Sequence, residues 1–492
     1  MEQDYIKLIF GLKLKQIRTD KELSLFGLSK LSGLSKSYLN EIEKGKKYPK
    51  PDKIALLSKH LEVPYDELVS LKLDKNLAPI GEILQSKILK EIPLELFGIQ
   101  ESTMIDIISN APTKVTAFIS TIIEIAKNYN FSKESFYLAS VRSFQEANNN
   151  YIDTMEEAVL AFAKTYQVDL TQPLKSKELE DILVEEYSYK INNTELASHT
   201  ELDNLRSVFI PKSKTLLLAK HIDDAQRTFI YAKEIAYNYL KISERLYTFS
   251  WIKFENFDQV LNNFYASYFA GALIIPRTRL VDDLKLLFSK KSFKAKDFER
   301  IIKNYNASPE SIYQRLTNIL PKDFNLKSLF FLRFSHQKGT NDFKLNKELH
   351  LSKQQSPHAN ETDEHYCRRW VSMKVLKSIS ASNKDHEFDI QISNYPNEEK
   401  TYLVMSSATT DPFVANRYRS VSIGIQINNQ FKRKVSFAES KSIPKAEVGV
   451  TCERCVIKNC DVRQAEPNVI TSKLMDEKIA NVVDQLQEKY SQ

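Results

Sequence analysis

Apolar residues near the N-terminus recur at the spacing of a helix. One face of a first helix is formed by Ile6, Ile9, Phe10, Leu14 and Ile17. Further short repeats up to about residue 71 predict five helices in this segment. Ser24 and Ser35 stand where the N-caps of the second and third helices are expected, and Gly33 stands in the turn between them.

Helical spacing continues through the middle of the chain, and alternating patterns appear later. Helices are predicted at about 80–89, 94–101, 103–108 and 113–129, across 133–167, and at 227–240 and 280–320. Residues 179–191 predict a helix and then a strand, and residues 207–220 predict a hairpin that turns near Pro211. Two strand pairs are predicted, 326–343 with 347–353 and 400–410 with 418–428.

This order of elements predicts a fold that is mainly α, with α+β parts. We expect a five-helix N-terminal domain at 1–73 and a helical region at 76–172. An α+β domain is expected at 173–320, and a second α+β domain with a cysteine cluster at 321–492.

Composition narrows the class of protein. The chain has 492 residues, 42% of them hydrophobic, and a net charge of +7, which permits a nucleic-acid partner. No apolar run reaches the roughly 18 residues of a membrane helix, and no secretion signal is visible at the N-terminus. We therefore expect a cytoplasmic protein without a membrane partner. The 4 cysteines are too few for a disulfide scaffold and point to metal or redox chemistry.

Two short helices joined by a glycine turn make a helix-turn-helix. The segment "LSLFGLSKLSGLSKSYLNEIEKGKKYPKPDKIALLSKHLEVPYDEL" closely resembles the Cro/C1-type (XRE) helix-turn-helix family. The resemblance implies that the third helix enters the major groove of double-stranded DNA. It also implies a homodimer that binds a pseudo-palindromic site.

The resemblance assigns roles to individual side chains. It places Lys36, Ser37, Asn40 and Glu41 toward base edges, where lysine suits guanine, asparagine suits adenine and glutamate suits cytosine. Phosphate contacts are expected from Arg18, Lys44, Lys46, Lys47 and Lys50.

A second motif lies in the predicted helix at 227–240. The run Ala232-Lys233-Glu234-Ile235-Ala236-Tyr237, followed by "YASYFAGALIIP", resembles the ImmA/IrrE metallopeptidase-like domain. The resemblance puts Lys233, Tyr237 and Tyr265 at the three zinc-ligand positions and Glu234 at the general base. Lysine repels a cation and tyrosine ligates poorly at neutral pH, so we expect a degenerate site without catalysis. In the alternative, this is an ordinary helix with Lys233 and Glu234 exposed.

All four cysteines lie near the C-terminus. Cys452, Cys455 and Cys460 follow a C-x-x-C-x-x-x-x-C pattern, and Cys367 lies upstream. Four thiolates favour a closed, structural zinc site. Three alternatives stay open: reduced thiols, a redox dithiol, and His365 in place of one ligand.

The same region resembles the C-terminal domain of the short-chain fatty acyl transcriptional regulators. Cys367 and Trp370 match one element, and a second is matched by Gly449, Val450, Cys452, Cys455, Cys460, Arg463 and Pro467. Arg368, Glu453, Gln464 and Glu466 depart from the pattern. The resemblance implies a small-molecule effector, such as an acyl-CoA. Arg368, Arg369 and Arg419 are candidates for its phosphates.

These observations together predict a sequence-specific DNA-binding transcriptional regulator that is not an enzyme. Two alternatives from other classes remain: a stress-linked peptidase-type regulator with a DNA-binding head, and an antitoxin-like protein-interaction module.

Overall fold

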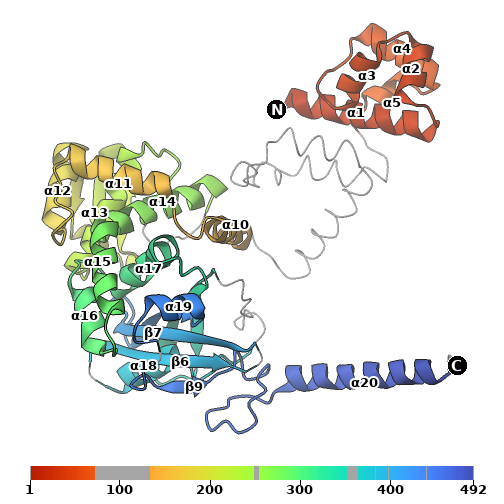
Figure 1. The fold of residues 1–492 in the computed structure, drawn as a ribbon. Helices are drawn as coiled ribbons and strands as arrows, with labels where there is room; N and C mark the ends of the chain where they lie inside the picture. Colours follow the sequence, from red (N-terminus) through yellow and green to blue (C-terminus); the bar gives the residue numbers. More distant parts are fainter. Residues whose placement is uncertain are drawn as a thin grey trace. The chain divides into compact units, whose positions relative to one another are not determined.

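The computed structural model describes residues 2–71, 133–248, 254–351, 364–382, 384–396, 398–438 and 440–490. These residues belong to two compact units, an N-terminal one and a larger body (Figure 1). The helices predicted between 80 and 129 lie outside the described residues. None of the described helices is long and apolar enough to cross a membrane.

The N-terminal module has the five predicted helices. They are α1 (Glu2–Asp20), α2 (Leu25–Ser32), α3 (Lys36–Glu43), α4 (Pro51–Leu61) and α5 (Tyr65–Val69). The hydroxyls of Ser24 and Ser35 cap α2 and α3, as expected, and Gly33 ends α2 at φ 70°. A Cβ on Gly11 would lie 2.2 Å from the carbonyl oxygen of Ile42, so only glycine allows α1 to approach α3 this closely.

The division between the two units falls inside α10 (Lys133–Ala147), after Ser140. The body continues with α11 (Asp153–Thr165) and α12 (Ser176–Glu185). A small sheet follows, in the order β1-β3-β2, from β1 (Lys190–Asn192), β2 (Ser207–Ile210) and β3 (Thr215–Leu218). Short 3-10 turns lie between its strands at Glu195–Ser198, Thr200–Leu202 and Pro211–Ser213. Helices α13 (Asp224–Tyr239) and α14 (Phe257–Ile274) come next.

The body continues with α15 (Arg277–Phe288), α16 (Ala295–Lys303) and α17 (Pro309–Asp323). A larger sheet then has the order β5-β4-β8-β7-β6-β9. Its strands are β4 (Leu329–Gln337), β5 (Phe343–His350), β6 (His386–Tyr395), β7 (Lys400–Thr410), β8 (Arg417–Gln426) and β9 (Lys445–Glu447). The remaining helices are α18 (Val371–Ala381), α19 (Asn429–Lys434) and α20 (Asn468–Tyr490).

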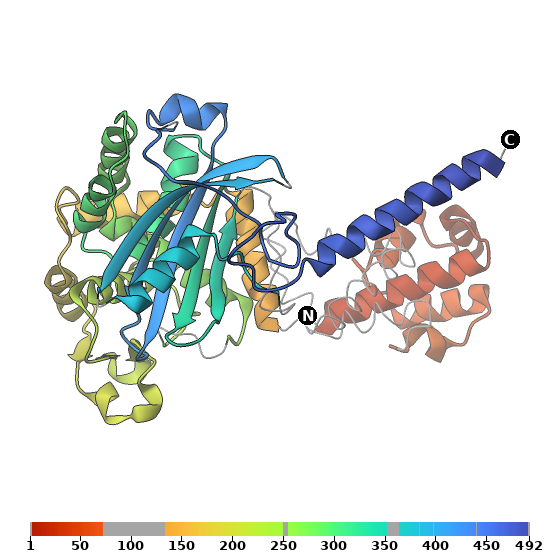
Figure 2. The same ribbon diagram turned by 90° about the horizontal axis from the view of Figure 1, so that it is seen from below.

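Both faces of the larger sheet are covered. Alternate residues of β4 enter different cores: Phe331 joins the main core, whereas Phe330 and Leu332 pack on the side that holds α18. Figure 2 shows α18 lying across the strands. A strand buried on both faces has a nearly continuous apolar sequence, which explains the run "LFFLRF".

The main core joins segments that the sequence analysis assigned to separate domains. It extends from Ile152 to Ile443, across the predicted boundaries at 172/173 and 320/321. The second boundary falls inside α17, whose residues Ile319 and Leu320 are buried in that core. The fold class is confirmed as mainly α with α+β parts, but the body has one shared core.

Candidate functional site

Helix α3 presents opposite faces to the protein and to solvent. Leu39, Ile42 and Glu43 are buried against the module. Lys36, Ser37, Asn40 and Glu41 are exposed on the other side, and together we call them the reading face. The four side chains predicted to face bases therefore share one accessible surface, which begins at the capped N-terminus of the helix.

The lysines that follow α3 are also accessible. Lys46, Lys47 and Lys50 are exposed, and Lys44 is half-buried. The Lys47 amine lies 3.6 Å from the Glu41 carboxylate and 5.1 Å from the centre of the Tyr38 ring. This ion pair is exposed, so it adds little stability and leaves Lys47 available to an anion.

Arg18 does not fit the predicted role of a phosphate contact. Its Nε and Nη2 donate to the two carboxylate oxygens of Glu43, at 2.6 and 2.9 Å, and its Nη1 donates to the Leu23 carbonyl at 2.7 Å. The Glu43 side chain is only 6% exposed. Arg18 neutralises this buried acid and links α1 to α3. The sequence feature that could have predicted this pair is the position of Glu43 on the apolar face of α3.

The motif on α13 is buried, contrary to the alternative that Lys233 and Glu234 are exposed. Both residues are 6% exposed. Glu234 accepts two hydrogen bonds from Arg245, at 2.6 and 2.7 Å, and one from the Tyr189 hydroxyl at 3.0 Å. A carboxylate held in this way is an ion-pair partner and is not poised to activate water.

The three degenerate ligand positions have different partners. The Lys233 amine donates to Asn263 at 2.6 Å, and the Tyr237 hydroxyl lies 3.5 Å from the same oxygen. Tyr265 instead packs its ring against Phe144 and Phe264. Burial lowers the pKa of Lys233 to about 8 although Glu234 acts to raise it. Asn263 and Arg245 complete this network and were missed by the sequence analysis.

Basic side chains gather around Glu310 in the body. Arg333 on β4 lies directly opposite Lys347 on β5. Arg419 on β8 lies opposite Ser335, which follows Arg333 by two residues on β4 and therefore shares its face of the sheet. Burial disfavours the charged form of Glu310, yet its pKa falls to about 2 because cations surround it. We call this group the cationic cluster, and its members are Arg206, Arg333, Lys347 and Arg419.

The cationic cluster remains partly accessible. The side chains of Arg333 and Arg419 are 27% and 21% exposed, and Lys347 is exposed although desolvation by nearby protein lowers its pKa. Nε of Arg333 is buried without a hydrogen-bond partner among the described residues. Arg419 also pairs with Asp411 at 2.6 Å. The cluster thus combines crowded cations with surface that a ligand can reach.

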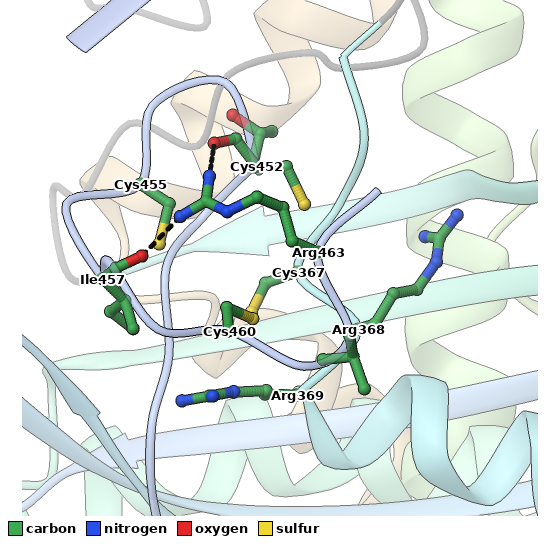
Figure 3. A pocket seen from close by; sticks show the side chains of 10 residues that line it. Cys367, Arg368, Arg369, Cys452, Cys455, Ile457, Cys460 and Arg463 are labelled. Atoms are coloured by element: carbon green, nitrogen blue, oxygen red, sulfur yellow. Dashed lines mark hydrogen bonds between the residues drawn. The ribbon is translucent and has the colours of Figure 1, made fainter. Parts of the chain in front are cut away.

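The four cysteines line one small cavity (Figure 3). A backbone bridge between Tyr366 and Thr451 joins the segment carrying Cys367 to the loop carrying the other three. A Cβ on Gly449 would lie 2.8 Å from the Cys455 sulfur, so the loop needs glycine there. The other lining residues are Arg368, Arg369, Thr451, Ile457, Val462 and Arg463.

The cavity offers sulfur donors without a preformed ion site. Within the described ranges, no group of three or more His, Cys, Asp or Glu side chains is arranged to hold a metal ion. Burial raises the pKa of Cys367 to about 11, so this thiol is protonated unless a bound cation displaces the proton. His365 does not line the cavity; its Nδ1 lies 2.7 Å from Glu453.

The arginines predicted to meet effector phosphates separate into two places. Arg368 and Arg369 line the cysteine cavity, where Arg368 donates to the carbonyls of Tyr366 and Asn341. Arg419 belongs to the cationic cluster in the sheet. The three candidate arginines therefore belong to two different groups of side chains.

Comparisons with known proteins find a match to the N-terminal motif and a second, weaker similarity over most of the chain. The sequence model of the helix-turn-helix family HTH_3 matches residues 14–68. The HTH-type transcriptional regulator RamB of Mycobacterium tuberculosis, in strains CDC 1551 / Oshkosh and ATCC 25618 / H37Rv, is 20% identical over 490 residues. That alignment covers 93% of this chain and 94% of RamB.

A solved structure described as a Mycobacterium tuberculosis transcriptional regulator gives a TM-score of 0.48 at 16% identity, covering 66% of this chain and 92% of that one. The likeness to ImmA/IrrE peptidases stays a prediction. The N-terminal module matches the HTH_3 helix-turn-helix model, and the chain as a whole is similar in sequence to the transcriptional regulator RamB.

Proposed function

We propose that the protein is a transcriptional regulator that binds double-stranded DNA through the reading face of α3. The observation that carries this proposal is the exposure of Lys36, Ser37, Asn40 and Glu41 on one side of a capped helix within a helix-turn-helix module. The full-length similarity to a regulator supports it. In this family of folds the second helix of the motif enters the major groove with its N-terminal residues at the bases.

The two sets of polar side chains have different tasks in this proposal. The reading face supplies donors and acceptors that distinguish base pairs in the major groove. Lys44, Lys46, Lys47 and Lys50 contact phosphates, which give affinity and register on the duplex without sequence information. Selection of duplexes from a random pool by the full-length protein tests the proposal. A shared motif is expected, and recovery of unrelated sequences would contradict it.

Asn40→Ala should change the preference at a single base pair. An asparagine that pairs with adenine in two hydrogen bonds contributes about 1–3 kcal/mol of discrimination, and alanine has neither group. The measurement is the affinity for the selected duplex and for its single-base variants. Lys59→Ala is the control, since Lys59 is exposed on a different helix, α4, and is not part of the reading face. An unchanged preference after Asn40→Ala would remove this residue from the readers.

For the effector, we propose a phosphate-bearing metabolite, such as a short-chain acyl thioester of coenzyme A, bound at the cationic cluster. Arg206, Arg333, Lys347 and Arg419 all lower the pKa of Glu310, and Arg206 and Arg419 are also influenced by Asp411. An anionic ligand would relieve the repulsion among these cations and accept charge-assisted hydrogen bonds. To regulate, it must bind one arrangement of the protein better than the other.

Arg333→Met should weaken binding of such a ligand about tenfold or more, because a charged hydrogen bond is lost. Calorimetric titration of the full-length protein with a short-chain acyl thioester of coenzyme A measures this. The control is Arg300→Met, which removes an arginine whose side chain is 68% exposed on α16. Equal affinities for both variants and the wild type would contradict this site.

For the cysteines, we propose a structural metal centre. Cys367, Cys452, Cys455 and Cys460 supply four sulfur donors around one cavity, a set that suits zinc or an iron–sulfur cluster. Our expectation is zinc. When bound, the metal would supply charge that keeps the thiolates deprotonated and would fasten the C-terminal loop to the segment carrying Cys367.

Cys455→Ser should abolish stoichiometric metal binding, because a centre of this kind needs its full set of thiolates. Elemental analysis together with a sulfide assay of the purified protein distinguishes about one zinc per chain from iron with sulfide. The matched control is Ser440→Ala, a half-buried serine outside the cavity. Wild-type protein that is folded and free of metal would refute the proposal.

A further inference from the structure

Helix α20, at the end of the body, has no buried residue. Its 23 residues make a helix about 35 Å long. From Thr471 to Tyr490 every residue is exposed, which includes several large apolar side chains. A helix this accessible gains no stability from packing within the described part of the chain, and isolated helices of ordinary sequence are marginal in water.

The apolar side chains of α20 are concentrated on one side. Met475, Ile479, Val482 and Leu486 recur at alternating four- and three-residue spacing, the repeat by which helices pack side by side. Val483 and Tyr490 widen the same face to about 100° of the helix circumference. We call these six residues the apolar stripe. Lys473, Glu477, Asn481, Asp484 and Glu488 lie on the opposite side.

The amount of exposed surface matches what an interface between two chains requires. Exposed fractions in the apolar stripe range from 44% for Val483 to 78% for Tyr490. For side chains of this size, these fractions correspond to roughly 600 Å² of accessible surface per chain. Two stripes packed together would therefore bury roughly 1,200 Å² in total, which is the lower end of the range for stable, specific interfaces. A patch of this extent on a protein surface marks an interaction site.

We propose that α20 is a self-association helix whose apolar stripe packs against the same stripe of a second copy of this chain. The role of this dimer rests on the proposed function. One helix-turn-helix reads only a half-site, and regulators of this kind bind DNA as dimers. A two-fold interface is self-complementary, so a single stripe on each chain suffices to close it.

The start of α20 is fixed to the cysteine loop. The backbone N–H groups of Val469 and Ile470 donate to the Glu453 carbonyl, at 3.1 and 3.2 Å. Glu453 lies between Cys452 and Cys455, both of which line the cysteine cavity. The loop that carries the sulfur donors therefore also holds the base of the self-association helix.

The mass of the full-length protein, measured by sedimentation in the absence of DNA, tests the proposal. Wild-type protein should have the mass of two chains. Ile479→Lys with Leu486→Lys should give a single-chain mass, because two cations are placed inside the stripe. Asn481→Lys with Asp484→Lys, the same change on the opposite face, should leave the mass at two chains. None of these residues contacts the core, so thermal unfolding of the body should be unchanged.

Three results would overturn the proposal. The first is a single-chain mass for the wild type, and the second is a two-chain mass for the variant with Ile479→Lys and Leu486→Lys. The third is a wild-type monomer in which another segment of the same chain protects the amides of α20 from hydrogen exchange. Because no DNA is present, failure here is distinct from failure of the DNA-binding proposal. A stripe variant that is monomeric should still bind a half-site weakly, with cooperative binding to paired half-sites lost.

Discussion

Glutamine in place of Glu234 should lower the free energy of unfolding of the body by about 3–5 kcal/mol. The pair of Glu234 and Arg245 is buried, with side chains 8% and 7% exposed. Without the carboxylate, the Arg245 guanidinium remains among the rings of Tyr237 and Phe209 as an uncompensated buried charge. Urea unfolding of the variant and the wild type measures the difference.

Asp181→Asn is the matched control for this prediction. It also removes a carboxylate from an ion pair, but the pair with Lys177 is exposed and should contribute little to stability. Adding Arg245→Met to Glu234→Gln should recover part of the loss, since the buried charge is then removed. A general base of a peptidase would behave differently: Glu234→Gln would leave stability unchanged and abolish a proteolytic activity.

Methionine in place of Arg18 should lower the free energy of unfolding of the N-terminal module by roughly 3 kcal/mol. This is near the lower end of the cost of breaking a buried ion pair, because the Arg18 side chain is partly exposed. The variant leaves Glu43 buried without the guanidinium that now donates to both its oxygens. Lys53→Met is the control, since its pair with Asp52 is exposed and weak. Thermal unfolding of the module within the full-length protein measures both.

The salt dependence of DNA binding separates the two roles considered for Arg18. If Arg18 contacted a phosphate, its loss would reduce the slope of log affinity against log salt by about one and leave stability intact. The structure predicts the opposite: reduced stability, with an unchanged slope measured below the unfolding temperature. Lys46→Ala should show the phosphate behaviour, because Lys46 is exposed beyond α3.

The local elements could be predicted from the sequence because short-range physics determines them. Ser24, Ser35 and Gly33 mark the ends of α2 and α3 by capping and by positive φ, and these constraints act within a few residues. The strands β4, β7 and β8 were visible as alternating or continuous apolar runs. Strand β6 and helices α18 and α20 were not predicted.

The partners of buried charges could not be predicted, because they come from distant positions. Glu43 pairs with Arg18 across 25 residues, and three of the cations around Glu310 lie on β4, β5 and β8, which become neighbours only in the folded sheet. Lys233 is polar by sequence yet buried, since Asn263 on α14 accepts its hydrogen bond. The shared core was equally hidden, because nothing local indicates that α17 belongs to both the preceding helices and the following sheet.

The ratio of affinities for a selected duplex and for a scrambled duplex of equal length, measured at physiological salt with full-length protein, tests the central claim most directly. If α3 reads bases through Lys36, Ser37, Asn40 and Glu41, the selected duplex should bind at least about 10³-fold more tightly. Equal affinities for the two duplexes would contradict the account.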